Sequence, residues 1–399
     1  MARASRSAFA SPLWRLFPMR CSKRHPASSR PSKRFLEMNT GTMMTNQSML
    51  SCSNLTKVFG ARSMQSIDTL DLSDSEGLKA RGLFAAVKNV TFDVKRGETF
   101  VVMGLSGSGK STLVRCLTRL IEPSRGTIAV DGLDFTTASE RTLIEIRRKK
   151  MGMVFQHFAL LPNRSVLENI MFPLEIQKVS QADARKRAEE LIATVGLQGL
   201  EKRFPREMSG GQQQRVGIAR SLATDPPVWF LDEPFSALDP LIRTDLQDEL
   251  LRLQRGFHKT TVFITHDLDE AVKIADRIAI MQNGSMVQIG TPEELILNPA
   301  NDYVRRFVSK VPLAKVVRVS SLIEPGLEPE GTPPCVAGSD TVETVAASLL
   351  DGPEVVAVNG SDGKRIGYMR RSKAIAVLAG VRAQIMSGST QPAAHPLPC

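Results

Sequence analysis

Gly104-Leu105-Ser106-Gly107-Ser108-Gly109-Lys110-Ser111 organises this chain, and it fits the phosphate-loop pattern G-x-x-x-x-G-K-[ST]. The residues before it, Thr99 to Met103, are typical of a buried strand, and those after it, Ser111 and Thr112 through Leu120, are typical of a helix. The three glycines let the backbone bend tightly and turn N–H groups inward, which makes an anion site at a helix N-terminus. Lys110 can reach the outer phosphates, and the Ser111 hydroxyl can ligate magnesium. The stretch predicts binding of a nucleoside triphosphate, and a chance glycine-rich turn is the alternative.

The composition is that of a globular protein with two or three domains. The chain has 399 residues, of which 42% are hydrophobic and 23% are charged. No run of 18 apolar residues occurs, so we do not expect the chain to span a membrane by itself. Its five cysteines are scattered and odd in number, which favours a reducing cytoplasm over a disulfide framework.

The net charge of +11 is concentrated at the N-terminus. Residues 1–36 hold seven Arg and two Lys and no acidic residue, and the rest of the chain is nearly balanced. We therefore expect residues 1–52 to be either a basic, disordered or transit-like arm or the product of a misplaced start, with translation beginning at Met38, Met43, Met44 or Met49. Ordered sequence is expected from about Ser53.

Two further strands are expected before the one that leads into the phosphate loop, over Ser53 to Gly60 and Ala85 to Val94. A polar insertion over residues 61–82 separates them. Phe59 ends the first strand, where it could stack on an adenine ring or pack in the core.

The residues after the first helix predict further strands and helices in alternation. Gly126 to Val130 with Asp131-Gly132 predicts a strand and hairpin turn, Thr142 to Lys150 a basic helix, and Met151 to Phe155 another strand. Gln156 ends that strand, where it could ligate a metal and sense a γ-phosphate or be an ordinary loop residue. Helical periodicity then predicts a small inserted subdomain, over about residues 157–225, whose exposed face is either a docking surface or merely solvated.

A second anion-binding pattern follows in Ser209-Gly210-Gly211-Gln212, at the start of a helix. The chain already has one phosphate-binding loop, so this second anion site needs another nucleotide or a second copy of the protein. Immediately downstream, the apolar strand from Val228 ends in Asp232 and Glu233, placed to hold magnesium through water and to polarise an attacking water.

The next strand, Thr261 to Ile264, comes after the tight connection Ser236 to Asp239. His266 follows it, at the edge where ligands of parallel sheets bind, and could hydrogen-bond a γ-phosphate.

In this order the motifs resemble the nucleotide-binding subunit of ATP-binding cassette (ABC) transporters, over roughly residues 53–310. The resemblance implies an α/β P-loop NTPase fold with a RecA-like core, an antiparallel β subdomain and a helical subdomain. It implies that Phe59 stacks on adenine, that the stretch through Thr112 holds the phosphates of ATP with Asp239 nearby, and that Ser111, Gln156 and Asp232 serve Mg²⁺. Glu233 is then the catalytic base and His266 the γ-phosphate switch. The Ser209–Gln212 stretch closes over the nucleotide of a second subunit, so a homodimer is expected.

A closer resemblance lies outside these motifs, in Ser236 to Thr244, Leu246 to Leu250 and Asn298 to Val304. These stretches look like importers of glycine betaine, proline betaine and related quaternary amines, with choline or another compatible solute as the alternative. The resemblance implies a membrane permease, a periplasmic binding protein and a peripheral place on the cytoplasmic face of the bacterial inner membrane.

After Val311 the pattern predicts strand, helix, strand, turn, strand and helix, ending near Ala379. Residues 311–384 resemble one CBS-type module, either regulatory or a small dimerising appendage, and residues 385–399 are expected to be a disordered tail.

Two other functions remain open from the motifs alone. One is a soluble cassette ATPase that acts on nucleic acid, although a specific nucleic-acid partner is not expected. The other is a phosphate-loop kinase, in which the Ser209 stretch and His266 have no role.

Overall fold

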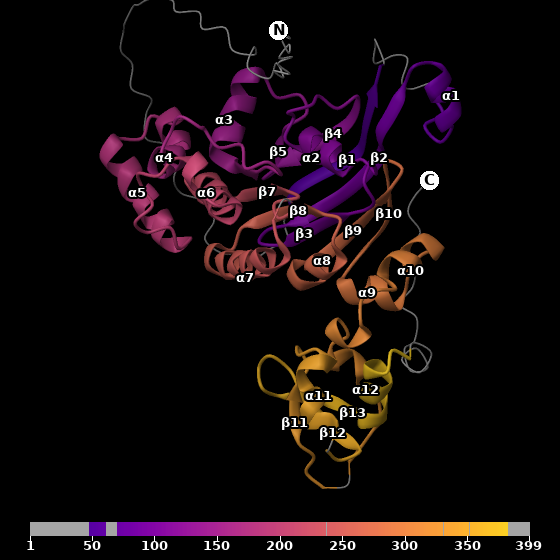
Figure 1. Cartoon of the computed structure of the whole chain (residues 1–399). Coiled ribbons are helices and arrows are strands. Elements are labelled where there is room, and N and C mark those ends of the chain that lie inside the picture. The colour runs from indigo at the N-terminus through magenta and orange to yellow at the C-terminus, as the bar shows by residue number, and fades with distance from the viewer. Residues whose placement is uncertain (1–47, 61–69, 237, 330, 351, 382–399) are drawn as a thin grey trace, which may run out of the picture. The chain divides into compact units, whose positions relative to one another are not determined.

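The computed structural model describes residues 48–60, 70–236, 238–329, 331–350 and 352–381 (Figure 1). The expectations for residues 1–47 and for the tail over 385–399 lie outside these ranges. The elements form a six-stranded sheet, a four-stranded sheet, a three-stranded sheet and the helices around them.

The six-stranded sheet has the order β10-β9-β3-β8-β7-β6, parallel except for β10. Its central strands are fully buried and mainly apolar, as expected for strands covered on both faces. Neighbouring residues alternate between two cores: Val228 and Phe230 pack on one face, and Trp229 and Leu231 on the other. The strand bounds are Thr99–Met103 (β3), Met151–Val154 (β6), Val228–Asp232 (β7), Thr260–Thr265 (β8), Arg277–Gln282 (β9) and Ser285–Gly290 (β10).

A helix follows each of the strands β3, β7 and β8 along the chain. These helices are α2 (Lys110–Leu117), α7 (Pro240–Phe257) and α8 (Leu268–Ile274). Since β3, β7 and β8 run in parallel, the residues that follow them come to one edge of the sheet.

The four-stranded antiparallel sheet has the order β2-β1-β4-β5, with bounds Ser48–Phe59 (β1), Phe84–Lys95 (β2), Arg125–Val130 (β4) and Leu133–Asp134 (β5). The expectation that order begins near Ser53 is wrong. Ser48 to Cys52 pair with β2 and β4, and Met49 and Leu50 are completely buried. Burying such side chains contributes about 1.5–3 kcal/mol each, so this part of the expected arm belongs to the folded core.

The insertion between β1 and β2 holds a helix that the polar sequence did not predict, α1 (Ser75–Ala80). Asp74 caps it, because the Asp74 carboxylate accepts a hydrogen bond from the N–H of Gly77 at 2.8 Å. Leu78 of this helix and Leu72 before it are buried in a small cluster with Val58 and Ala85.

Three helices lie in the segment of the expected helical insertion, α4 (Val166–Ile176), α5 (Gln181–Thr194) and α6 (Gly210–Leu222). A short turn, η2 (Pro205–Glu207), precedes α6. A reciprocal capping box between Ser165 and Glu168 begins α4. The basic helix is α3 (Glu140–Lys150), which begins two residues before the expected Thr142.

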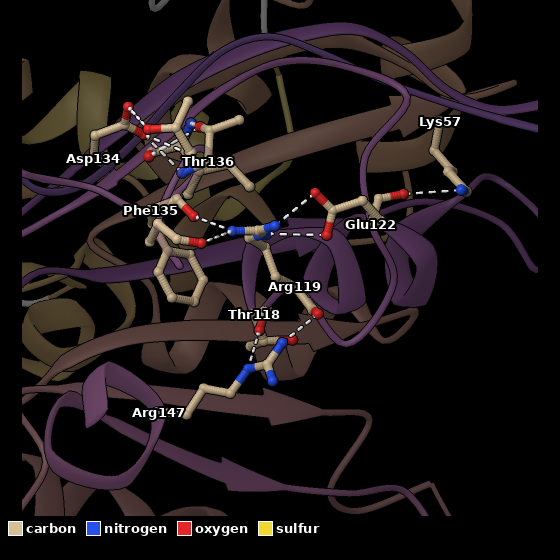
Figure 2. Close-up of polar contacts among 11 residues, drawn as sticks. Lys57, Thr118, Arg119, Glu122, Asp134, Phe135, Thr136 and Arg147 are labelled. Atoms are coloured by element: carbon tan, nitrogen blue, oxygen red, sulfur yellow. Dashed lines mark hydrogen bonds and ion pairs between the residues drawn. The ribbon is translucent and has the colours of Figure 1, made fainter. Parts of the chain in front are cut away.

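The C-terminal end of α2 is anchored by two arginines (Figure 2). Arg119 donates to the Phe135 carbonyl at 2.8 Å and to the Glu122 carboxylate at 2.7 Å. Arg147 of α3 donates to the carbonyls of Thr118, at 3.0 Å, and of Arg119. Because the carbonyls of Thr118 and Arg119 follow the end of α2, the Arg147 guanidinium satisfies acceptors that the helix itself leaves open, while Arg119 ties the same end to Phe135 and Glu122.

The last part of the chain carries α9 (Pro292–Leu297), α10 (Asp302–Val308), η3 (Leu313–Lys315) and η4 (Val319–Leu322). They precede a three-stranded sheet, β11-β12-β13, with β11 and β12 parallel and β13 antiparallel. The expected succession of elements is confirmed as Cys335–Ala337 (β11), Val342–Leu350 (α11), Val355–Asn359 (β12), Arg365–Arg370 (β13) and Arg371–Leu378 (α12). Among the described helices, none combines the length and apolarity that a bilayer span needs.

Candidate functional site

The phosphate-loop pattern lies between β3 and α2, at the expected edge of the sheet. Gly104, Gly107 and Gly109 all have positive φ, at 154°, 80° and 104°. A Cβ at Gly104 would collide with the Met281 carbonyl oxygen, and one at Gly109 with the Ala86 carbonyl oxygen. A Cβ at Gly107 would meet nothing within 4 Å. Two glycines therefore let the loop pass close to its neighbours, and the third faces open space.

Lys110 is almost completely buried inside this loop, with 4% of its surface exposed. Its ammonium donates to the carbonyls of Gly104 at 2.9 Å and Leu105 at 3.1 Å. Burial lowers the pKa of Lys110, and the nearby carboxylates of Glu233 and Asp232 oppose that shift. The distance from Lys110 Nζ to Glu233 Oε1 is 4.0 Å.

The loop also holds a polar atom with no protein partner. Ser108 is 5% exposed, and among the described residues its hydroxyl has no hydrogen-bond acceptor or donor. A buried hydroxyl without a partner is costly, so the site fits a ligand that brings hydrogen-bonding atoms into the loop. Phosphate oxygens have this chemistry.

Asp232 and Glu233 come at the end of β7, beside the start of α2. Asp232 is buried and accepts a hydrogen bond from the Ser111 hydroxyl at 3.0 Å. Burial raises the pKa of Asp232, although the Ser111 hydrogen bond lowers it. A divalent cation beside the two oxygens would favour the ionised form, so this pair suits Mg²⁺.

Glu233 has a backbone conformation that non-glycine residues rarely adopt, with φ of 46°. Its N–H is held by the Ile264 carbonyl at 3.0 Å, which fixes the turn out of β7. The carboxylate contacts His266, whose Nδ1 lies 3.3 Å from Glu233 Oε2. The structure thus brings together Lys110, Ser111, Asp232, Glu233 and His266 from the ends of three parallel strands.

Other predicted site residues lie apart from this group. Gln156 is exposed in the turn after β6, and within the described ranges it makes no hydrogen bond to the group. Phe59, at the end of β1, is 40% exposed, and the Lys57 ammonium lies 5.1 Å from the centroid of its ring. Asp239 caps α7 without a side-chain hydrogen bond.

The Ser209–Gln212 stretch begins α6 as a complete capping box. The Ser209 hydroxyl accepts from the Gln212 N–H at 3.3 Å, and the Gln212 side chain accepts from the Ser209 N–H at 3.0 Å. Gly210 and Gly211 occupy the first helical positions, whose N–H groups have no acceptor within a helix. In the described part of the chain, no hydrogen bond joins this helix start to the phosphate loop.

A buried carboxyl near His266 was missed by sequence analysis. Glu270 is 5% exposed and accepts from Gln247 Nε2 at 3.2 Å. Burial raises the pKa of Glu270 to about 7. Asp267 caps the same helix and lies 3.4 Å from the guanidinium of Arg243. The Asp267-x-x-Glu270 spacing is a capping pattern that could have indicated the helix start, but not the burial.

A groove of about 340 Å³, lined by Phe155 next to Gln156 in sequence, opens between α3, β6 and the helical insertion. Its lining is mainly apolar and includes three arginines. The residues include Arg147, Arg148, Met151, Phe155, Phe172 and Ile176.

Three comparisons relate the chain to known proteins. A family model described as ABC transporter matches residues 87–236. The trimethylamine N-oxide transport system ATP-binding protein TmoW of Pelagibacter ubique (strain HTCC1062) is 48% identical over 328 residues, or 82% of this chain and 96% of that protein. The glycine betaine/proline betaine transport system ATP-binding protein ProV of Escherichia coli (strain K12) is 50% identical over 269 residues, or 67% of each.

A solved structure matches the cassette part of the fold. It is the dimeric, post-hydrolysis state of the ATP-binding cassette MJ0796 bound to ADP and Pi. The TM-score is 0.52 at 32% identity, over 61% of this chain and 99% of that one.

Proposed function

This chain belongs to the family of ABC transporter ATP-binding proteins, and from that premise we propose that it energises import of glycine betaine, proline betaine or a related methylated amine. The observation that carries the proposal is the group formed by Lys110, Ser111, Asp232, Glu233 and His266 at one edge of the sheet. Trimethylamine N-oxide is a second candidate solute, because the similarity to TmoW extends over 82% of this chain.

ATP would lie along the phosphate loop. Lys110 exchanges the carbonyls of Gly104 and Leu105 for phosphate oxygens, and the Ser108 hydroxyl gains the partner it lacks. Ser111 and Asp232 would hold Mg²⁺, with Gln156 approaching from the turn after β6. The ion supplies charge neutralisation on the phosphates.

Glu233 would act as the general base. Its carboxylate lies at the mouth of the loop, 4.0 Å from Lys110 Nζ and 3.3 Å from His266 Nδ1. It orients a water toward the γ-phosphate and accepts the proton, while His266 fixes the carboxylate and binds a γ-phosphate oxygen. The strained turn at Glu233 holds the carboxylate in this place.

The working unit would be a homodimer. The Ser209–Gln212 helix start makes no hydrogen bond to the phosphate loop within the described part of its own chain, so its free N–H groups suit the nucleotide of a second copy. Asp239 would lie beside that interface. The similarity to a dimeric cassette supports this arrangement.

A permease would dock in the groove beside Gln156, at the cytoplasmic face of the inner membrane, with a periplasmic binding protein on the far side. Arg147 supports this placement, since it lines the groove and also binds the carbonyls at the end of α2. A displacement of α3 would therefore reach the helix that starts at the phosphate loop.

Residues 53–310 would form the cassette, extended at least to Ser48, with residues 157–225 as its helical subdomain. Residues 311–384 would form a single CBS-like module that regulates transport or assists dimerisation. The sheet β11-β12-β13 with α11 and α12 supports an independent module.

The experiment is solute uptake by cells that lack the gene, complemented with the wild-type chain or with Glu233→Gln, under salt stress. Betaine, proline, choline and trimethylamine N-oxide are offered separately. We expect wild type alone to restore uptake of a methylated amine. Uptake unaffected by loss of the gene, or recovery of nucleic acid instead of a permease with the purified protein, would overturn the proposal. ATP hydrolysis that requires a small-molecule acceptor would instead indicate a kinase.

A further inference from the structure

The contacts around Glu233 and His266 continue into helices α7 and α8, which lie side by side (Figure 1). A small cavity of about 10 Å³ is lined by Glu233 and His266 and by residues of both helices. This volume is close to the room that a single water needs, so the lining side chains surround it closely. Among the described residues of this lining, Arg243 is the only arginine or lysine.

We propose that Arg243 of α7 is a positioning residue for ATP hydrolysis, because its guanidinium joins the turn that carries His266 to the connection that follows Glu233. The proposal rests on the proposed function, since it assumes that Glu233 and His266 act on the γ-phosphate. Arg243 does not act on the nucleotide itself. It keeps the base and the histidine in the relative position that the reaction needs.

On one side, Arg243 holds the turn between β8 and α8. Its Nη1 lies 3.4 Å from Oδ2 of Asp267, the residue directly after His266. The other carboxylate oxygen of Asp267 accepts from the Glu270 N–H at 3.2 Å and so caps α8. The Asp267 N–H donates to the Thr265 hydroxyl at 3.0 Å. Because Asp267 is fixed on both sides, the peptide units that flank His266 are fixed with it.

On the other side, Arg243 holds the connection after β7. Its Nη2 donates to the Leu238 carbonyl at 3.4 Å. The Leu238 N–H donates to the Phe235 carbonyl at 3.2 Å. The Ser236 N–H and hydroxyl both donate to the Glu233 carbonyl, at 3.3 and 3.0 Å. Arg243 is thus linked to Glu233 by a short series of hydrogen bonds.

These two sets of contacts close into a ring, because Glu233 Oε2 lies 3.3 Å from His266 Nδ1. In a closed ring, no member can move without displacing both of its neighbours. Glu233 is therefore held from its backbone and from its carboxylate at once. A displacement of about 1 Å at reacting groups can slow a reaction about 100-fold, so a side chain that closes such a ring matters for turnover.

Charge also favours Arg243 in this position. Three carboxylates line the cavity with it, those of Glu233, Asp267 and Glu270. Burial and the Asp267 charge raise the pKa of Glu270, and the Arg243 charge opposes that shift. Without the guanidinium, the carboxylates would repel one another, and Asp267 would lose the partner of one oxygen.

The test measures ATP turnover and ATP binding for Arg243→Gln. The side chains of Arg243 and Asp267 are 28% and 31% exposed, so their ion pair contributes little to stability and we expect this variant to fold. We expect kcat to fall about 10- to 100-fold, because the base and the histidine lose their alignment. KM and Kd for ATP should stay as in wild type, because the phosphate loop is unchanged.

Two further variants serve as controls. Arg255→Gln removes the same charge from an exposed position of α7 and should hydrolyse ATP as wild type does. Arg243→Lys keeps the charge but not the two-armed contact, so its loss should be smaller than that of Arg243→Gln. If urea unfolding shows that Arg243→Gln does not fold, Arg243→Lys takes its place in every comparison.

A double-mutant cycle with Asp267→Asn tests the route. Asparagine keeps the oxygen that caps α8 and removes the charge that faces Arg243. Since Arg243 acts partly through Asp267, the double variant should be no slower than Arg243→Gln alone. Losses that multiply, wild-type turnover by Arg243→Gln, or a loss of ATP affinity in place of kcat would overturn the inference. If the wild-type protein hydrolyses no ATP, the proposed function itself fails.

Discussion

The two glycine-containing stretches that we propose as phosphate-binding are built differently. The loop from Gly104 to Ser111 combines positive φ values, a buried lysine and the Ser108 hydroxyl, which has no hydrogen-bond partner among the described residues. In the stretch from Ser209 to Gln212, the side chains cap their own helix and are satisfied. The first stretch therefore has polar groups that a ligand can bind. The second is a stable helix start that can contribute only its exposed N–H groups, which suits a surface that meets the nucleotide of another subunit.

The largest effect should come from Glu233→Gln. This variant should still bind ATP at the first stretch and form the dimer through the second stretch, but it should not hydrolyse the ATP efficiently. Loss of the general base should reduce ATP turnover by about 10² to 10⁴, while ATP-Mg binding persists. The trapped protein should then elute as a dimer in size-exclusion chromatography.

Adding Ser209→Glu to that variant places a carboxylate where the neighbour's phosphates arrive. Repulsion should return the protein to a monomer that still binds ATP. If Glu233→Gln hydrolyses ATP normally, the assignment of the base is wrong. A Glu233→Gln protein that stays monomeric with ATP-Mg would contradict the shared site.

Replacing single glycines by alanine should lower the free energy of unfolding by different amounts in the two stretches. Gly109→Ala places a carbon against the Ala86 carbonyl, so we expect a loss of roughly 2–4 kcal/mol in the free energy of unfolding. Gly107→Ala has open space and should lose only about 1–2 kcal/mol, from the left-handed backbone.

Gly210→Ala is the matched control at the other stretch. Its Cβ would lie 3.4 Å from the Leu238 side chain, an ordinary contact on a helical backbone. Urea unfolding should rank the variants in that order, and equal losses at Gly109 and Gly107 would show that the close approach to Ala86 is unimportant.

The pH dependence of the free energy of unfolding should reveal the protonation of Glu270. This residue is buried beside His266 and belongs to neither stretch. Because burial raises its pKa to about 7, the folded protein binds the Glu270 proton more tightly than the unfolded chain does. The free energy of unfolding should therefore fall as pH rises from about 4.5 to 7 and stay low above that, with a total change of roughly 1–3 kcal/mol.

Glu270→Gln keeps the acceptor for Gln247 and removes the titration. This variant should be more stable than wild type at pH 8 and similar to it near pH 4.5, by urea unfolding at each pH. Identical pH profiles for the two proteins would contradict the raised pKa.

The smallest effect is expected at the capping box. Ser209→Ala removes one cap and should cost about 1 kcal/mol of stability. ATP binding to the isolated subunit should not change, because in the described structure this helix start does not contact the phosphate loop. Weaker ATP binding by a protein that remains monomeric would show that the second stretch serves its own site.

Local chemistry was sufficient to predict much of this protein. The phosphate loop depends on glycine conformations and a lysine at a set spacing, and the buried strands β3, β7 and β8 each hold three or four consecutive apolar residues, so both are visible in the sequence. The order of the motifs then indicated the family, and the succession of elements from β11 to α12 followed from periodicity and turns.

Only the tertiary structure decided which residues are buried and which neighbours they meet. Ser48 to Cys52 resemble the polar arm before them, yet they are ordered because β2 and β4 pair with them. Glu270 looks like a surface carboxylate on a helix, and Arg243 like an ordinary helix residue. Their surroundings come from segments distant along the chain, so burial, a raised pKa and a place beside Glu233 and His266 are properties of the fold.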